Sequence, residues 1–164
     1  MPATRPGRMM MVWVLLMASS MAARGDDAVT VAGTWVGHYG CAQGTTGLTL
    51  TVTAARKPRV RALFHFYADK SNPSVPEGCF EMEGTFDSFS GRVELHGGKW
   101  IVRPEGYVTV DFEGEVSPGG DGMTGLVVGP FCDKFELHRV ASSSPRSKGT
   151  CPPRGAAISL LGQR

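Results

Sequence analysis

The sequence lacks a second long hydrophobic run beyond the one near its N-terminus. Arg5 and Arg8 precede the apolar stretch MMMVWVLLM at 9–17, and a run of small residues follows it. This order is typical of a signal peptide, and the apolar stretch is too short to span about 30 Å of hydrocarbon. We therefore expect residues 1–25 to be a signal peptide and Asp26 to begin a secreted protein without a membrane anchor.

The sequence also lacks a strong charge of either sign. It carries 17 basic and 15 acidic residues, and three of the arginines lie in the predicted signal peptide. The remaining 14 basic and 15 acidic groups nearly cancel. The basic cluster RKPRVR at 56–61 is typical of a turn between strands. Since this pattern offers no basic face to replace phosphate counterions, we expect no nucleic-acid partner.

Motifs of the common hydrolases and nucleotide-binding enzymes are missing. The sequence has no G-x-S-x-G nucleophile elbow, no phosphate loop and no H-E-x-x-H zinc site. It has four histidines, and strand alternation predicts that His38, His65 and His138 face outward on separate strands. We therefore expect no enzymatic activity and no cofactor.

Carboxylates supply the one enzymatic alternative. Asp111, Glu113 and Glu115 share an outward face of one predicted strand, and Glu81 and Glu83 share that of another. Paired carboxylates are what a glycosidase needs, but alternating polar residues are also typical of any half-exposed strand. A hydrolase that uses outward carboxylates is the least favoured alternative.

A helical period is missing, whereas a period of two runs through residues 31–140. In TLTVTA, Leu50 and Val52 alternate with threonines, which predicts a strand with one solvated face. Similar alternation occurs in TWVGHYGC, VRALFHF, FEMEGTF, RVELH, WIVR, YVTVDFEGEV, MTGLVV and FELHRV. We therefore expect eight or nine strands. Their inward side chains should include Phe64, Phe66, Phe80, Phe86, Val108, Phe112 and Phe135.

The connections favour an antiparallel meander, because most are short and rich in turn residues and only 68–78 is long. Glycines recur inside strands at Gly84, Gly114 and Gly125, where a missing side chain permits sharp coiling. Repeated kinks suit a sheet that closes on itself. We predict an all-β domain at 31–140 that forms a small barrel, with a β-sandwich as the alternative and residues 141–164 as a flexible Ser/Pro/Gly-rich tail.

Four cysteines are present, and their spacings of 38, 53 and 19 residues include no C-x-x-C pair. We therefore expect no metal site. An even number of cysteines in a secreted chain predicts two disulfides. Closure would make the first and last strands neighbours, which favours Cys41–Cys132 together with Cys79–Cys151. Strict alternation turns Cys41 inward but Cys132 outward, so this pairing needs a bulge or twist, and Cys79–Cys132 is the main alternative.

Residues at the two ends of the predicted domain resemble known proteins. Gly33-Thr34-Trp35 in the first strand and Arg139 in the last are similar to the pattern of calycins, the superfamily of lipocalins, fatty-acid-binding proteins and avidins. This resemblance implies a calycin-like barrel in which Arg139 stacks over Trp35. The lipocalin T-D-Y motif and a helix after the last strand are missing from the sequence.

A second resemblance covers residues 35–44 and 132–139. They resemble uncharacterised secreted microbial domains that carry a W-x-G-x-Y-x-C-x-Q-G signature and end in C-x-x-F-x-L-x-R.

The calycin resemblance implies a secreted, disulfide-stabilised binding module for a small apolar ligand or a partner protein. Within HGGKWIVRPEGY, a glycine pair and a Pro-Gly turn flank aromatic residues that can reach a barrel rim. We therefore take Trp100, Tyr107 and His96 as candidate ligand-binding residues. The alternative is an interaction module whose filled core leaves no room for a ligand. In both cases we expect a monomer.

Overall fold

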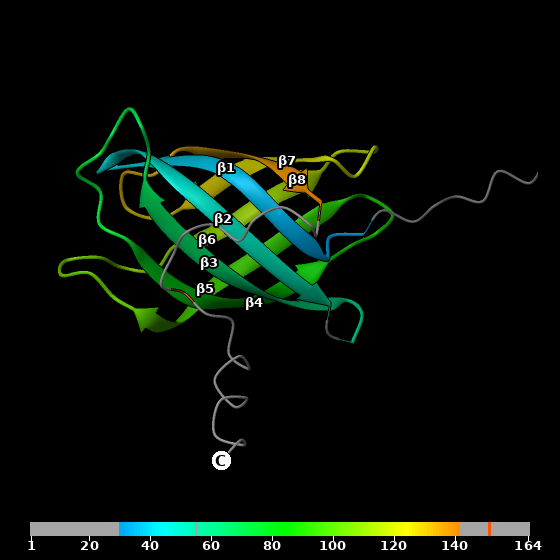
Figure 1. Ribbon diagram of the computed structural model, residues 1–164. Helices are drawn as coiled ribbons and strands as arrows, with labels where there is room; N and C mark the ends of the chain where they lie inside the picture. The colour runs from blue at the N-terminus through cyan, green and yellow to red at the C-terminus, as the bar shows by residue number, and fades with distance from the viewer. Residues whose placement is uncertain (1–29, 55, 142–150, 152–164) are drawn as a thin grey trace, which may run out of the picture.

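The computed structural model describes residues 30–54, 56–141 and 151 (Figure 1). The predicted signal peptide lies outside these residues, as does the predicted tail apart from Ala141 and Cys151. The described residues form eight strands: β1 (Gly33–Cys41), β2 (Gly44–Ala54), β3 (Arg59–Ala68), β4 (Gly78–Phe86), β5 (Arg92–Val102), β6 (Asp111–Val116), β7 (Gly122–Val128) and β8 (Lys134–Val140). The described residues contain no helix with the length and apolar character needed to cross a membrane.

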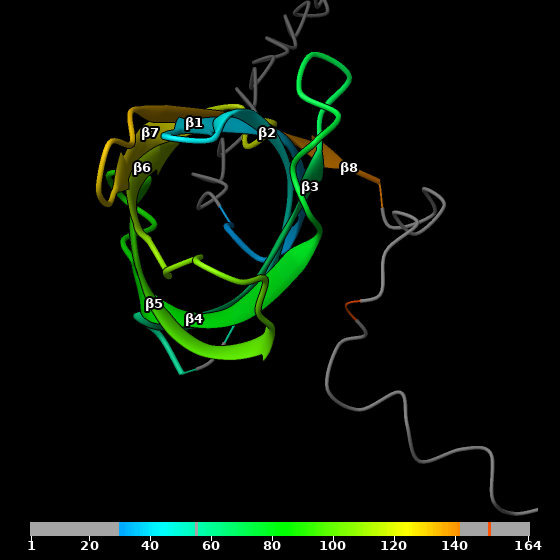
Figure 2. The ribbon, with the colours of Figure 1, turned by 90° about the vertical axis from the view of Figure 1, so that its left-hand side faces the viewer.

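The strands form a closed antiparallel barrel with a mean radius of 8 Å. Each strand pairs with the next along the chain, and β8 returns to pair with β1, where Trp35 lies opposite Arg139. Figure 2 looks into the barrel and shows the strands as a ring. The predicted meander and closure are confirmed, and the sandwich alternative is wrong.

Eight strands agree with the predicted eight or nine, and RVELH and WIVR, which alternate separately in the sequence, belong to one strand, β5. The register between β4 and β5 shifts in the middle of β5, where Phe80 pairs with Trp100 but Met82 pairs with Gly97. The irregularity falls at the Gly97-Gly98 pair. The glycines therefore bend a continuous strand and do not end it.

Aromatic rings fill much of the barrel interior. Phe112 and Phe135 stack with ring centroids 4.1 Å apart, Phe64 and Phe80 stack at 4.6 Å, and Phe64 meets Phe112 edge-on at 5.2 Å. Such geometries add to the free energy gained by burying the rings themselves. Phe86 is only partly buried and packs against this core from its edge.

Several strand glycines are required by close approach, and Gly114 and Gly84 are two examples. At Gly114, a Cβ atom would lie 2.6 Å from the ring of Phe135, and at Gly84 it would lie 1.8 Å from the carbonyl oxygen of Glu94. Both distances are too short for a carbon atom. The recurring glycines thus let strands and rings of a narrow barrel come close together.

One end of the barrel is closed around Trp35, whose side chain is fully buried. Its indole Nε1 donates a hydrogen bond to the carbonyl of Val31 at 3.0 Å. The guanidinium carbon of Arg139 lies 4.1 Å from the centre of the Trp35 ring. Arg139 also donates to the carbonyls of Ala32 and Gly120, each at 2.6 Å. One arginine thereby joins the segment before β1 to the β6–β7 turn.

Two disulfides are present, Cys41–Cys132 and Cys79–Cys151, which are the pairs that the sequence favours. Cys132 precedes the first residue of β8, Lys134, so strand alternation does not fix its direction. This resolves the apparent conflict between an inward Cys41 and an outward Cys132. Two disulfides suggest an oxidising compartment.

We expect Trp35→Ala to lower the free energy of unfolding by about 3–5 kcal/mol, because it removes a large buried ring. Arg139→Ala should also destabilise the barrel. Because the two groups stack, the double variant should lose about 1 kcal/mol less than the sum of the single losses. Urea unfolding of the four proteins measures this coupling, and fully additive losses would show that the stack contributes nothing.

Joint replacement of Cys41 and Cys132 by alanine should lower the free energy of unfolding by about 4–5 kcal/mol. The reason is that the cross-link spans 91 residues and limits the unfolded chain. Denaturant unfolding without reductant measures the loss. Mass spectrometry of a non-reduced digest checks the pairing, and a peptide that joins Cys79 to Cys132 would contradict it.

Candidate functional site

The end of the barrel opposite Trp35 is formed by one tight turn and three longer connections. Four connections meet there: residues 42–43 between β1 and β2, 69–77 between β3 and β4, 103–110 between β5 and β6, and 129–133 between β7 and β8. The Cys41–Cys132 disulfide ties the first of these to the last.

The β5–β6 connection crosses the opening (Figure 2). β5 pairs with β6 only from Arg92 to Leu95, and β6 begins at Asp111. The predictions that a strand starts at Tyr107 and that only 68–78 is a long connection are therefore wrong. Gly97 leaves room for this inward course, because a Cβ atom there would lie 2.7 Å from Thr109 and from the carbonyl oxygen of Val110.

Tyr107 and Val108 show how this segment sits across the opening. Tyr107 points inward and stacks on Phe66, with ring centroids 5.3 Å apart and planes inclined by 13°. Val108, predicted to lie in the core, is 56% exposed because it belongs to the crossing segment and not to a strand. Alternation along a loop that rests on the barrel mouth thus resembles alternation along a strand.

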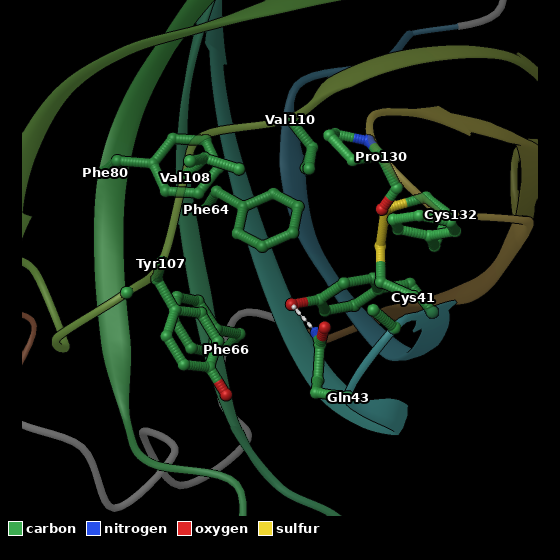
Figure 3. A pocket seen from close by; sticks show the side chains of 14 residues that line it. Cys41, Gln43, Phe64, Phe66, Phe80, Tyr107, Val108, Val110, Pro130 and Cys132 are labelled. Atoms are coloured by element: carbon green, nitrogen blue, oxygen red, sulfur yellow. Dashed lines mark hydrogen bonds between the residues drawn. A yellow bond between two sulfur atoms is a disulfide. The ribbon is translucent and has the colours of Figure 1, made fainter.

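A pocket of about 400 Å³ lies beneath the crossing segment (Figure 3). Three buried rings from the barrel wall, those of Phe64, Phe66 and Phe80, line its inner part. The remaining lining residues come from the connections and the end of β1: Tyr39, Cys41, Ala42, Gln43, Gly106, Tyr107, Val108, Val110, Pro130, Phe131 and Cys132. All of these lining side chains are uncharged.

One polar group of side chains lies on the β1–β2 side of the pocket. The amide Nε2 of Gln43 donates to the Tyr39 hydroxyl at 3.1 Å (Figure 3, dashed line) and to the Thr46 hydroxyl at 3.3 Å. Thr46 in turn donates to the carbonyl of Gly44 at 3.1 Å. The Gln43 amide nitrogen is thereby engaged, whereas its Oε1 has no hydrogen-bond partner among the described residues.

The two phenols of the pocket stay protonated. Burial raises the pKa of Tyr39 far above its ordinary value near 10, and the neighbouring Tyr107 phenol raises it further, although hydrogen bonds with Thr46 and Gln43 oppose the rise. Burial also raises the pKa of Tyr107. Both hydroxyls are therefore neutral at physiological pH and can donate a hydrogen bond.

The rim of the pocket is apolar and exposed. Phe131 is 88% exposed, and its backbone has φ of 55°, a left-handed conformation that is uncommon for a large residue. It lies between Pro130 and the disulfide-bonded Cys132. Together with Val108, it gives the pocket an apolar entrance.

Of the three ligand-binding residues that the sequence predicted, only Tyr107 lines the pocket. Trp100 packs edge-on against Phe80 at 5.0 Å and lies outside the lining. His96 is exposed outside the pocket, with its Nδ1 3.1 Å from a carboxylate oxygen of Asp111. The structure therefore does not bring the three residues together at one site.

Asp111 closes the gap where β5 and β6 separate. Its carboxylate accepts hydrogen bonds from the Gly97 amide at 2.8 Å and from His96. Burial raises the pKa of Asp111, but these hydrogen bonds outweigh burial, so that the net shift is downward. This carboxylate is a structural acceptor at the edge of β6.

The candidate catalytic residues lie away from the pocket. Glu113 and Glu115 are exposed on β6, and no carboxylate of the described residues lines the pocket. The prediction that three histidines lie on the surface is wrong for His65, whose ring faces outward but is covered by the β3–β4 connection. Its Nε2 lies 2.6 Å from Oε1 of Glu77. No group of three metal-ligating side chains is found in the described residues.

Sequence reasoning missed Tyr39, Gln43 and Phe131 as pocket residues. The first two lie in the W-x-G-x-Y-x-C-x-Q-G stretch, and Phe131 lies in the Gly-Pro turn before Cys132, so the local signals were present. No known protein family and no curated protein matches the sequence. The functional argument therefore depends on the shape and chemistry of the pocket.

The raised pKa of Tyr39 predicts a loss of stability at high pH. The unfolded chain releases the Tyr39 proton near pH 10, whereas the folded chain retains it at higher pH. The free energy of unfolding thus keeps its full value below about pH 10 and falls as the pH rises further. Urea unfolding at about pH 9 and about pH 11 should show a smaller fall for Tyr39→Phe than for the unsubstituted protein. Equal falls would contradict the assignment.

Proposed function

We propose that the protein is a secreted binding module that holds a small apolar ligand in the pocket at the open end of the barrel and catalyses no reaction. The observation that carries this proposal is the pocket of about 400 Å³ with aromatic walls and an apolar rim. Ligand sites are typically apolar cavities of about 300–1,000 Å³ with a few placed polar groups. The Gln43–Tyr39 pair supplies such groups here.

The filled interior limits the size of the ligand. Below the pocket, buried rings occupy the interior of the barrel, including those of Phe112 and Phe135. A long alkyl chain would have to displace these rings, which would sacrifice core packing. The ligand is therefore compact and stays near the opening.

The compartment and the superfamily are part of the same proposal. Secretion is supported by the predicted signal peptide and by two disulfides, which suggest an oxidising environment. A calycin-like origin is supported by the closed eight-strand meander and by the contact of Trp35 with Arg139. We expect the module to act as a monomer, without a nucleic acid or membrane partner.

A protein partner is the second candidate. The exposed side chains of Phe131 and Val108 favour it, because exposed apolar groups at a rim are typical of protein contacts as well. In that case the aromatic interior would serve stability alone, and small ligands would not affect the protein.

The neutral fluorescent probe N-phenyl-1-naphthylamine tests ligand binding. We expect its fluorescence to rise in the presence of the protein. At about 100 times its Kd it should stabilise the fold by about 2.7 kcal/mol in thermal unfolding. Absence of both effects would favour the second candidate.

A matched pair of variants locates the binding site. Phe131→Lys places a charge at the rim and should weaken probe binding several-fold. Phe89→Lys should leave binding unchanged, because Phe89 is fully exposed in the β4–β5 turn, outside the pocket lining. Equal effects of both variants would place the probe elsewhere.

A further inference from the structure

The side chains that line the pocket are suited to one chemical class of ligand. Its lining combines aromatic and aliphatic side chains with two phenols and one amide, and none of these groups is charged. A charged ligand group that entered would lose hydration without meeting an opposite charge, which is strongly unfavourable. A ligand group buried in this pocket is therefore neutral.

The polar side chains on the β1–β2 side offer both an acceptor and a donor. Gln43 uses its amide nitrogen within the protein, so its Oε1 is the acceptor on offer. The protonated Tyr39 hydroxyl, which accepts from Gln43, becomes the donor when it turns its proton from Thr46 to the ligand. A hydroxyl group or an amide can bond to both, because each can donate and accept.

The walls favour a flat ring system. Tyr107 and Phe66 present a stacked pair on one side, and Phe64 and Phe80 present a second stacked pair. Aromatic rings attract other rings in offset-stacked and edge-on arrangements, with a gain beyond that of burying the same area. Flat conjugated molecules therefore fit these walls better than branched aliphatic ones.

We propose that the ligand is a compact, uncharged aromatic molecule that carries one neutral hydrogen-bonding group directed at Gln43 and Tyr39. This inference rests on the proposed function, since it names the ligand class of the same pocket.

The expected contribution of the polar group is modest. Gln43 and Tyr39 bond to each other in the absence of ligand, so a ligand without a polar group leaves only Oε1 of Gln43 without a partner. One added neutral hydrogen bond should therefore improve affinity about three- to tenfold. A carboxylate should weaken binding at least about tenfold relative to the hydroxyl, because it must lose either its hydration or this hydrogen bond.

Three probes on one ring system test this class: 2-naphthol, naphthalene and 2-naphthoate, compared at pH 7 by displacement of N-phenyl-1-naphthylamine. We expect 2-naphthol to bind most tightly, naphthalene about three- to tenfold more weakly, and 2-naphthoate at least about tenfold more weakly than 2-naphthol.

Two variants assign the preference to residues. Gln43→Leu and Tyr39→Phe should each lower the affinity for 2-naphthol toward that of naphthalene, while the affinity for naphthalene itself stays within about twofold. Retained naphthalene binding also shows that the variants are folded. Thr53→Val is the control, because the Thr53 hydroxyl bonds to the Arg61 carbonyl at an exposed position outside the pocket lining. It should change no affinity.

The outcomes separate the two proposals. If neither the fluorescent probe nor any naphthalene derivative binds, both the proposed function and the assigned ligand class are wrong. If the probe binds but 2-naphthoate competes as well as 2-naphthol, the pocket is real and the assigned class is wrong. Loss of naphthalene binding in both variants, at unchanged melting temperature, would also overturn the assignment. It would mean that these side chains do not act through the polar group of the ligand.

Discussion

The pairing of β1 with β8 is the constraint on which the rest of the structure depends. It joins strands about a hundred residues apart, removes both edges of the sheet, and turns one face of every strand toward a shared interior. It also sets Trp35 opposite Arg139 at one end and brings Cys41 beside Cys132 at the other. Closing so long a loop is entropically unfavourable. The disulfide offsets that cost, because it also holds these two segments together in the unfolded chain.

Closure at this radius also decides where a ligand can bind. An eight-stranded barrel is just wide enough for its own side chains, and here large rings occupy the bore. Among the described residues, space for a ligand is found where the wall ends. At the closed end, Arg139 and the segment before β1 use that space. At the other end, β5 and β6 separate after Leu95, and the chain between them forms a roof with a pocket beneath it.

The sequence predicts the wall better than the mouth for a physical reason. Alternation reports whether a side chain faces the interior, which is a local property of a strand, and so Leu50, Phe64 and Phe112 are all buried as expected. The same alternation misassigns Val108, because a loop resting on a barrel mouth also has one buried face and one exposed face. His65 shows the converse error, since an outward residue is buried when a connection, here the one between β3 and β4, folds back over it. Which end is open, and which connection crosses it, depends on pairings between segments far apart in the chain.

Stability and recognition share side chains in this barrel. Phe64, Phe66 and Phe80 line the pocket and also belong to the core. Deepening the pocket by truncating one of them would create a cavity, with a loss of several kcal/mol for a large aromatic residue. Gln43, Tyr107 and Phe131 lie on connections, where substitutions disturb the core less. Changes of ligand preference in a barrel of this kind are therefore expected to arise on the connections around the mouth, while the inner rings stay fixed by the need to fill a closed sheet.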